Sequence, residues 1–235
     1  MTVNDERRDF FTRIAKGYDD CVVNAIGYTA YKTLPERALE LHPGAKTVLD
    51  LACGTGLSSE AFFAQGLEVI GIDYSPGMIE VARKRPYKEL HCQRIDDVLP
   101  VADDSFDLAI AIGVTEFIEN PKALLQSVWH KLSESGLFAL TLPVPSENSS
   151  TLNIKDYTLE SFMALVNPKE FILADSFELY GWKSGYLAAI DGEPSGVHLL
   201  VNYTAVFLRK QPDKMKRTTC SEISRPKSVE ASAPD

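Results

Sequence analysis

The amino-acid sequence predicts an α/β fold with a doubly wound, mostly parallel sheet of seven strands and an antiparallel pair at one edge. Short apolar runs alternate with amphipathic segments from residue 46 to residue 142. Apolar strands separated by helices are typical of a parallel sheet covered on both faces. After Pro143, two longer strand-like runs follow with no crossover helix between them, which predicts the antiparallel pair.

Two helices are expected before the first strand. Residues 5–20 carry apolar and aromatic side chains at helical spacing, and Gly17–Asp20 is expected to end that helix. A second helix is expected from about Thr29 to Leu41, because His42-Pro43-Gly44 is a strong helix stop. Since both helices precede the first strand, we place residues 1–45 outside the alternating core, as an N-terminal helical lid.

The alternating core begins at Lys46. Caps mark its helices: Gly66 follows one, and Ser75-Pro76 and Asn120-Pro121 each place an N-cap residue before a proline. A turn is expected at Ser135-Gly136, before the fifth strand. The expected strands are residues 47–51, 67–73, 89–95, 106–112 and 137–142, and the expected helices include residues 57–64 and 76–84 and a helix that begins near 121.

Beyond Pro143 the pattern changes. We expect a polar loop at 143–150, a short helix at 158–166 and two long strands at 171–180 and 202–209, with a glycine-rich segment at 181–196 between them. The core domain is therefore expected to span residues 46–210. Residues 211–235 are polar and charged with few apolar side chains, which predicts a disordered tail.

Composition excludes several classes of function. The chain has 235 residues, of which 45% are hydrophobic, which suffices for a globular core. A net charge of −9 argues against a general nucleic-acid binder. No apolar run approaches the length of a membrane span. The charged N-terminal segment and four scattered cysteines favour free thiols in a reducing compartment, so a cytoplasmic location is expected. No cysteine or histidine cluster has metal-ligand spacing, so no metal is expected.

The turn after the first strand is the strongest candidate for a ligand site. A strand that ends in a glycine turn and a helix N-terminus presents backbone N–H groups to a ligand, and Gly54 and Gly56 permit close approach. The dinucleotide fingerprint G-x-G-x-x-G is incomplete, because Ser59 stands at the third glycine position, and Asp50 lies inside the strand end. A plain tight turn is the alternative.

Asp73 ends the second strand. A carboxylate at this place in a doubly wound sheet can accept hydrogen bonds from both ribose hydroxyls of an adenosine. Its alternative role is to cap the following helix.

Together, Asp50-x-x-Cys-Gly-Thr-Gly56 and Gly71-Ile-Asp-Tyr-Ser-Pro-Gly-Met78 resemble the motifs of class I S-adenosylmethionine-dependent methyltransferases, and specifically the small-molecule, methyltransferase type 11-like family. The resemblance covers residues 46–142 and implies a Rossmann-like core that binds S-adenosyl-L-methionine. It departs from the family pattern at Ala52, which stands where the first of three glycines is usual.

The resemblance also implies roles for individual residues. Asp73 would hold the ribose, while Tyr74 and Met78 pack near the adenine. Asp96 would bind the adenine amino group, with the adjacent Asp97 as the competing choice. The full expected cofactor-binding set is Asp50, Ala52, Gly54, Gly56, Asp73, Tyr74, Met78, Ile95, Asp96 and Gly113.

The expected reaction is in-line transfer of the methyl group to a small-molecule acceptor, catalysed mainly by positioning. Glu116 and Tyr18 are the candidate catalytic residues; Glu116 could act as a base or bind an amine, or lie on the surface, and Tyr18 could close over the cofactor or pack on the core. The N-terminal helices and the loops at 143–157 and 181–198 are expected to form the acceptor pocket. The alternatives are a non-catalytic S-adenosylmethionine-binding protein, an aminopropyltransferase and a methyltransferase that acts on a protein.

Overall fold

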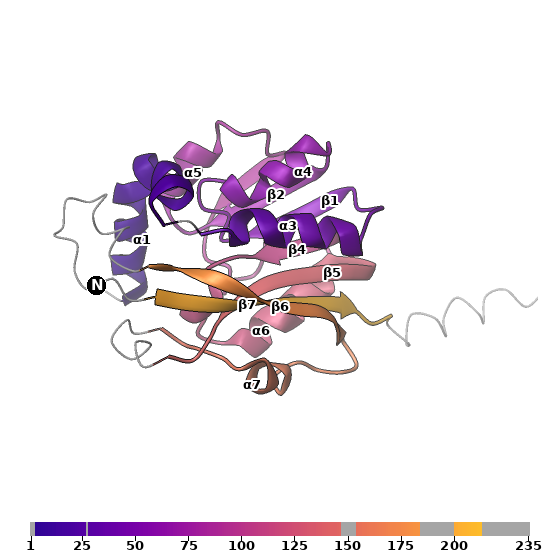
Figure 1. Cartoon of the computed structure of the whole chain (residues 1–235). Helices are drawn as coiled ribbons and strands as arrows, with labels where there is room; N and C mark the ends of the chain where they lie inside the picture. The colour runs from indigo at the N-terminus through magenta and orange to yellow at the C-terminus, as the bar shows by residue number, and fades with distance from the viewer. Residues whose placement is uncertain (1–2, 27, 147–153, 184–199, 213–235) are drawn as a thin grey trace, which may run out of the picture.

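A computed structural model describes residues 3–26, 28–146, 154–183 and 200–212, and within these ranges the chain forms one seven-stranded sheet with helices on both faces (Figure 1). The strand order is β3-β2-β1-β4-β5-β7-β6. The strands are β1 (Thr47–Leu51), β2 (Glu68–Asp73), β3 (Glu89–Cys92), β4 (Phe106–Ala111), β5 (Leu132–Pro143), β6 (Phe171–Lys183) and β7 (Leu200–Lys210).

The sheet has the mixed topology that the sequence predicts. Strands β3, β2, β1, β4 and β5 are parallel, and Val48 at the centre pairs with Val69 on one side and Leu108 on the other. Strand β7 runs antiparallel between β5 and β6, with Phe138 opposite Leu208. The expected α/β class with an antiparallel edge pair is therefore confirmed. Because β1 and β4 are adjacent while the chain passes to β2 between them, the strand order reverses beside β1.

Helices cover the two faces of the sheet. The α-helices are α1 (Val3–Ile14), α2 (Tyr18–Asp20), α3 (Ala30–Leu41), α4 (Glu60–Ala64), α5 (Pro76–Ala82), α6 (Pro121–Lys131) and α7 (Leu159–Met163). Single turns of 3-10 helix occur at η1 (Ala15–Gly17), η3 (Leu57–Ser59) and η4 (Thr115–Phe117), and η2 (Cys21–Ile26) is π-helical. The expected N-caps at Ser75 and Asn120 are confirmed, since their side chains accept from the backbone N–H groups of Met78 and Ala123.

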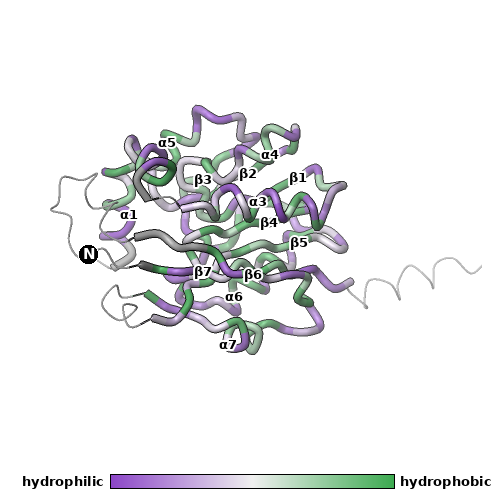
Figure 2. Tube along the Cα trace, in the orientation of Figure 1, coloured by the Kyte–Doolittle hydropathy of each residue, from purple (hydrophilic) through white to green (hydrophobic). Residues whose placement is uncertain are grey.

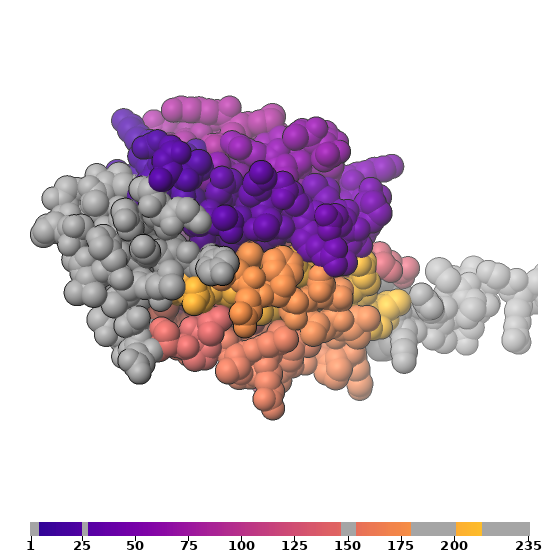
Figure 3. Space-filling view, viewed as in Figure 1, coloured from indigo at the N-terminus to yellow at the C-terminus, as the bar shows by residue number. Residues whose placement is uncertain are grey.

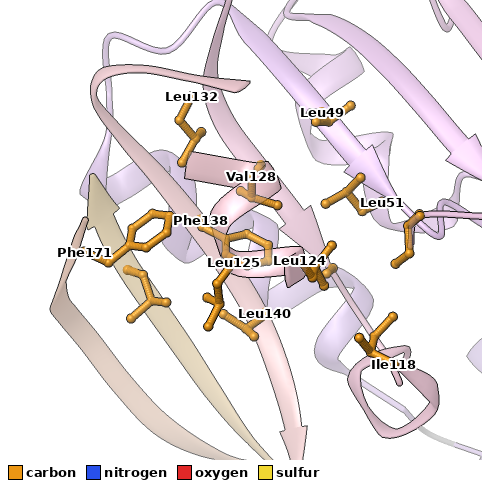
Figure 4. Close-up of a cluster of buried hydrophobic side chains, with 14 of the residues drawn as sticks. Leu49, Leu51, Ile118, Leu124, Leu125, Val128, Leu132, Phe138, Leu140 and Phe171 are labelled. Atoms are coloured by element: carbon orange, nitrogen blue, oxygen red, sulfur yellow. The ribbon is translucent and has the colours of Figure 1, made fainter. Parts of the chain in front are cut away.

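Alternate residues along each strand supply the two cores. One core joins Leu49, Leu51 and Phe138 to α6 and α7 (Figure 4). The other joins Val48 and Leu108 to α3 and α4 on the opposite face. Figure 2 shows the central strands as mostly hydrophobic along their length, as expected for strands buried on both faces.

The structure separates the two N-terminal helices that the sequence groups as one lid. Helix α3 packs on the sheet through Ala30, Leu34 and Ala38, all fully buried, so it belongs to the layer that covers the core. A hydrogen bond of 2.7 Å from Arg37 to Asp175 joins α3 to β6, and Figure 3 shows these two elements side by side on one face. The expectation that both helices lie outside the core therefore fails for α3, because its apolar stripe covers strands β5 and β7 near the antiparallel edge.

Helix α1 lies instead against α5. At the contact, a Cβ atom on Gly77 would meet the backbone oxygen of Thr12 at 2.5 Å, so glycine is required for the approach. The hydroxyl groups of Thr12 and Ser75 are hydrogen-bonded at 3.0 Å. The N-terminal helix is thus fixed beside the segment that follows Asp73.

Several boundaries differ from the expectation. Strand β5 begins at Leu132, which pairs with Phe106, and the expected turn at Ser135 is a bulge inside the strand, with φ +64° at Ser135. Strand β3 ends at Cys92, β6 and β7 extend beyond the expected ends, and α1 ends at Ile14 before the 3-10 turn. The predicted tail from 213 onward, residues 184–196 of the glycine-rich segment and residues 147–150 of the polar loop lie outside the described residues.

Candidate functional site

A cavity of about 180 Å³ lies at the carboxyl ends of β1, β2 and β4, where the strand order reverses. Ligands of open α/β sheets bind at this position. Of the residues expected to bind a cofactor, Ala52, Gly54, Asp73, Tyr74, Met78, Ile95, Asp96 and Gly113 line this cavity. The strand ends thus bring together residues that are up to 61 positions apart in the sequence, from Ala52 to Gly113.

Asp73 is held from two sides by the backbone. Its Oδ2 atom accepts a hydrogen bond of 2.8 Å from the N–H of Gly54, and its Oδ1 atom accepts one of 2.7 Å from the N–H of Ser75. Burial raises the pKa of Asp73 from 3.8 to about 6, although the two N–H groups act in the opposite direction. A carboxylate has about four acceptor sites, so Asp73 retains acceptor capacity toward the cavity.

The turn after β1 uses left-handed backbone at three positions. Ala52, Gly54 and Gly56 have φ values of +56°, +54° and +89°. Left-handed backbone costs a residue with a Cβ atom about 1–2 kcal/mol, so Ala52 occupies a conformation that glycine adopts freely. This explains why a glycine at the position of Ala52 would be usual in such a turn.

Gly56 faces away from the cavity. A Cβ atom there would lie 2.7 Å from the ring of Tyr87 and 2.8 Å from Cδ of Arg85. Its lack of a side chain therefore makes room for these two residues, and the structure does not place Gly56 on the wall of either cavity described here.

Asp50 likewise lies behind the turn, where it is 2% exposed. Its Oδ2 atom accepts hydrogen bonds from the hydroxyls of Ser59 at 2.6 Å and Tyr87 at 2.8 Å. Burial raises the pKa of Asp50 to about 6. The structure gives Asp50 contacts that hold the turn and the start of the next helix, where the sequence suggested a cofactor contact. Tyr87, its partner, carries no local motif that sequence analysis could have used.

The far end of the cavity contains the two competing aspartates. Asp96 lines the cavity and accepts a hydrogen bond of 2.6 Å from Arg94, whereas Asp97 does not line it. The guanidinium groups of Arg94 and Arg8 lie 5.7 and 5.4 Å from the ring centre of Tyr74. The geometry favours Asp96 over Asp97 for a contact in this cavity.

A second cavity of about 270 Å³ adjoins the first and shares with it Tyr18, Ala52, Gly54 and Gly113, among others. It is lined largely by aromatic side chains: Phe10, Phe11, Tyr18, Tyr28, Tyr31, Phe117 and Tyr203. The backbone of Gly113, with φ +65°, lies between the two cavities, and its N–H donates to Thr141 at 2.8 Å. Most of these aromatic residues lie outside the motifs and were not identified from the sequence.

Glu116 is the acidic residue on the wall of the second cavity. It is 3% exposed, so the surface role considered from the sequence is wrong. Oε1 accepts a hydrogen bond of 2.7 Å from the hydroxyl of Tyr203, whereas Oε2 has no hydrogen-bond partner among the described residues. Burial raises the pKa of Glu116, while Tyr203 and the positive charge of Arg7 oppose that shift.

A polar cluster ties the N-terminal segment to the turn after β1. The Thr55 hydroxyl donates to Asp19 in α2, and Arg85 donates to the other Asp19 oxygen at 2.8 Å. Arg85 also donates to the backbone oxygen of Thr55 at 2.7 Å. Tyr18, beside Asp19, lines both cavities, and burial raises its pKa. This cluster, which we call the Asp19 latch (Asp19, Thr55 and Arg85), closes the N-terminal segment over the cavities.

Two negative findings concern the described part of the chain alone. Within it, no group of three His, Cys, Asp or Glu side chains is arranged to hold a metal ion. Of the helices described, none is both long and apolar enough to cross a membrane.

The comparisons with known proteins agree with this geometry. Residues 49–140 match the family model described as "Methyltransferase domain". The chain is 38% identical over 126 residues to a demethylmenaquinone methyltransferase of Paenarthrobacter aurescens, covering 51% of this chain and 48% of that protein. It is 31% identical over 131 residues to a ubiquinone biosynthesis O-methyltransferase of Xylella fastidiosa, covering 54% and 48%. The chain therefore spans about half the length of the curated relatives it matches.

A solved structure shares the fold. It is a SAM-dependent methyltransferase, possibly a histamine N-methyltransferase, from Thermotoga maritima, with a TM-score of 0.60 at 19% identity and coverage of 87% of this chain and 99% of that one. The likeness at this identity concerns the Rossmann-like fold. The match of residues 49–140 to the family model confirms the resemblance that the motifs around Gly54 and Asp73 carry.

Proposed function

Because residues 49–140 of this chain match the family model described as "Methyltransferase domain", we propose that the protein transfers a methyl group from S-adenosyl-L-methionine to a small-molecule acceptor. The observation that carries the proposal is the Asp73 carboxylate, fixed by the N–H groups of Gly54 and Ser75 at the end of β2 and facing a cavity.

The residues of the first cavity fit this cofactor. Asp73 has acceptor capacity for two ribose hydroxyls. Ile95 and Met78 offer apolar contacts for an adenine ring, and Asp96 offers an acceptor for its amino group. Gly54, where a Cβ atom would point into open space, leaves room beside the turn for the amino-acid end. When bound, the cofactor supplies an activated methyl group on a positively charged sulfur.

The protein's own contribution is chiefly positional. The second cavity adjoins the first at Gly54 and Gly113, so an acceptor held there lies next to the cofactor site. Alignment of two reactants in this way can lower a barrier by roughly 7–11 kcal/mol. The Asp19 latch fixes the segment that carries Tyr18, whose side chain lines both cavities.

For the acceptor, the names of the relatives favour a quinone-type small molecule. The seven aromatic side chains of the second cavity support a flat, ring-containing acceptor, because aromatic rings pack well against one another. Small-molecule transfer is preferred over a protein acceptor because Glu116 and Tyr203 lie buried inside the fold. The cytoplasmic location stays a prediction of the sequence.

Calorimetric titration of the purified protein with S-adenosylmethionine tests the proposal, with NAD as the control ligand because both share an adenosine. We expect saturable binding of S-adenosylmethionine with a dissociation constant below about 1 mM, and none of NAD. The absence of binding at millimolar S-adenosylmethionine would contradict both the methyltransferase and the non-catalytic binding alternative. Binding without release of S-adenosylhomocysteine in the presence of quinol acceptors would favour the non-catalytic alternative.

A further inference from the structure

Glu116 is a buried carboxylate whose two oxygens differ. Oε1 accepts a hydrogen bond from the hydroxyl of Tyr203, whereas Oε2 has no hydrogen-bond partner among the described residues. Glu116 also lines the second cavity. A buried polar atom without a partner destabilises the fold, because it has lost its hydrogen bonds to water and gained none in return. The fold therefore retains a costly acceptor at the wall of the second cavity, and a ligand that donates a hydrogen bond there would satisfy it.

The groups around Glu116 indicate which kind of donor fits. Charged or titratable groups act on it from several elements: Arg7 of α1, Tyr18 of α2, Tyr28 ahead of α3, Tyr157 ahead of α7 and Tyr203 of β7. Arg7 is the cation among them, and it lines the same cavity with its guanidinium 4.5 Å from the ring centre of Phe117. A cationic amine attracted to Glu116 would be repelled by Arg7, whereas a neutral hydroxyl meets no such penalty.

Resting on the proposed function, we infer that Glu116, on the wall of the second cavity, accepts the proton that the methyl acceptor loses, and that Tyr203 positions Glu116. We infer further that the methyl acceptor is a neutral, flat aromatic molecule carrying a hydroxyl group. Glu116 contacts the substrate directly and Tyr203 acts through Glu116. Tyr203 is itself fixed from the other side, by the ring of Tyr28 at 5.9 Å between centroids.

The hydroxyl proton of the acceptor moves to Oε2 of Glu116, and the acceptor oxygen forms a bond to the transferred methyl carbon. The electron pair of the broken carbon–sulfur bond stays with sulfur, and the proton on Glu116 then leaves to water. Burial raises the pKa of the Glu116 carboxyl group, which makes its carboxylate a stronger proton acceptor, and Arg7 in the same cavity stabilises the developing negative charge on the acceptor oxygen.

The test uses the protein saturated with S-adenosylhomocysteine, titrated with two molecules of similar shape. These are 2-naphthol, which is neutral, and 2-naphthylmethylamine, which is cationic at neutral pH. We expect 2-naphthol to bind at least tenfold more tightly, and Glu116→Gln to weaken its binding about tenfold while S-adenosylhomocysteine binding stays within twofold. Glu119→Gln is the matched control, because that side chain is 70% exposed and lines neither of the two cavities.

Tyr203→Phe separates positioning from simple packing. It removes the donor that stabilises the charged form of Glu116, so the pH midpoint of 2-naphthol binding should move upward while binding at high pH is kept. Tighter binding of the amine, equal binding of 2-naphthol by Glu116→Gln, or binding of neither ligand would each overturn the inference. If the unmodified protein does not bind S-adenosylhomocysteine, that result would instead count against the proposed function.

Discussion

The backbone N–H of Gly54 donates a 2.8 Å hydrogen bond to the carboxylate of Asp73, so the turn after β1 is tied to the end of β2. The two residues that the sequence marked separately thus form one unit. Asp73 orders the turn and at the same time faces the cavity. Its role as a helix cap, considered from the sequence, is held by Ser75 instead, whose hydroxyl accepts from Met78.

Asp73→Asn tests this unit. The amide nitrogen would face the N–H of Gly54 or of Ser75, donor against donor, and the two bonds to ribose would be weakened. Because hydrogen bonds to a charged group contribute about 1.5–3 kcal/mol each, we expect affinity for S-adenosylmethionine to fall about 100-fold or more in calorimetry. Asp175→Asn on β6 is the control and should bind normally. An Asp73→Asn protein with unchanged affinity would remove Asp73 from the cofactor site.

The affinity should also depend on pH. The pKa of Asp73 in the free protein is raised from 3.8 to about 6, and ribose hydroxyls donate to the charged carboxylate. Cofactor binding is therefore expected to be full above pH 6 and to weaken by up to about tenfold per pH unit as pH falls below it. Titrations with S-adenosylhomocysteine between pH 5 and pH 8 measure this. A flat profile would show that Asp73 does not titrate in this range or does not contact the ligand.

The choice between the adjacent aspartates has a direct test. Asp96 lines the cavity and Asp97 does not. We expect Asp96→Asn to lower S-adenosylmethionine affinity about five- to tenfold, as for the loss of one hydrogen bond, and Asp97→Asn to leave it unchanged. Each variant serves as the control for the other in the same titration, and the reverse ranking would reassign the adenine contact to Asp97.

The Asp19 latch should govern how fast the cofactor leaves. Arg85→Gln removes the charge that bonds Asp19 and the backbone of Thr55. We expect the dissociation rate of S-adenosylhomocysteine, measured by stopped-flow displacement, to rise several-fold. Arg83→Gln is the matched control, because Arg83 is exposed in the same segment and has no latch contact. Equal rates for the two variants would mean that the latch does not limit release.

Asp50 provides a test of stability. Its pKa is raised in the folded protein from 3.8 to about 6, so folding binds a proton between those values and the free energy of unfolding falls as pH rises through this window. Above pH 6 the charged carboxylate costs up to about 3 kcal/mol. Urea unfolding at pH 7.5 should therefore find Asp50→Asn as stable as the unmodified protein or more so, with the difference gone at pH 4. If Asp50→Asn had a lower free energy of unfolding than the unmodified protein at pH 7.5 but not at pH 4, the fold would favour the charged form of Asp50.

Much of the fold follows from local sequence signals. Thr29, Ser75 and Asn120 each precede a helix, and the central strands are continuous apolar runs. The place of α3 could not be inferred in the same way, because its apolar stripe would look alike whether it covered the sheet or an acceptor pocket. The bulge at Ser135 could not be predicted from the sequence either. Leu132 is both the C-cap of α6 and the first residue of β5, so no loop separates the helix from the strand.

The sequence predicted those parts of the site in which the backbone conformation restricts which residue can stand at a position. Gly54 and Asp73 belong to short motifs, and these motifs identified the edge of the sheet. The partners of Asp50 and Glu116 come from distant segments, at Tyr87 and Tyr203. Such pairs are created by packing and leave no pattern at either position. For that reason the sequence could not distinguish a buried Glu116 from a surface one.

The most direct measurement of the central claim is a crystal structure of the protein with S-adenosylhomocysteine. We expect both ribose hydroxyls within hydrogen-bonding distance of the Asp73 carboxylate, the adenine against Met78 and Ile95, and the sulfur directed toward the second cavity beside Gly113. A ligand bound elsewhere, or a ribose with no contact to Asp73, would contradict it.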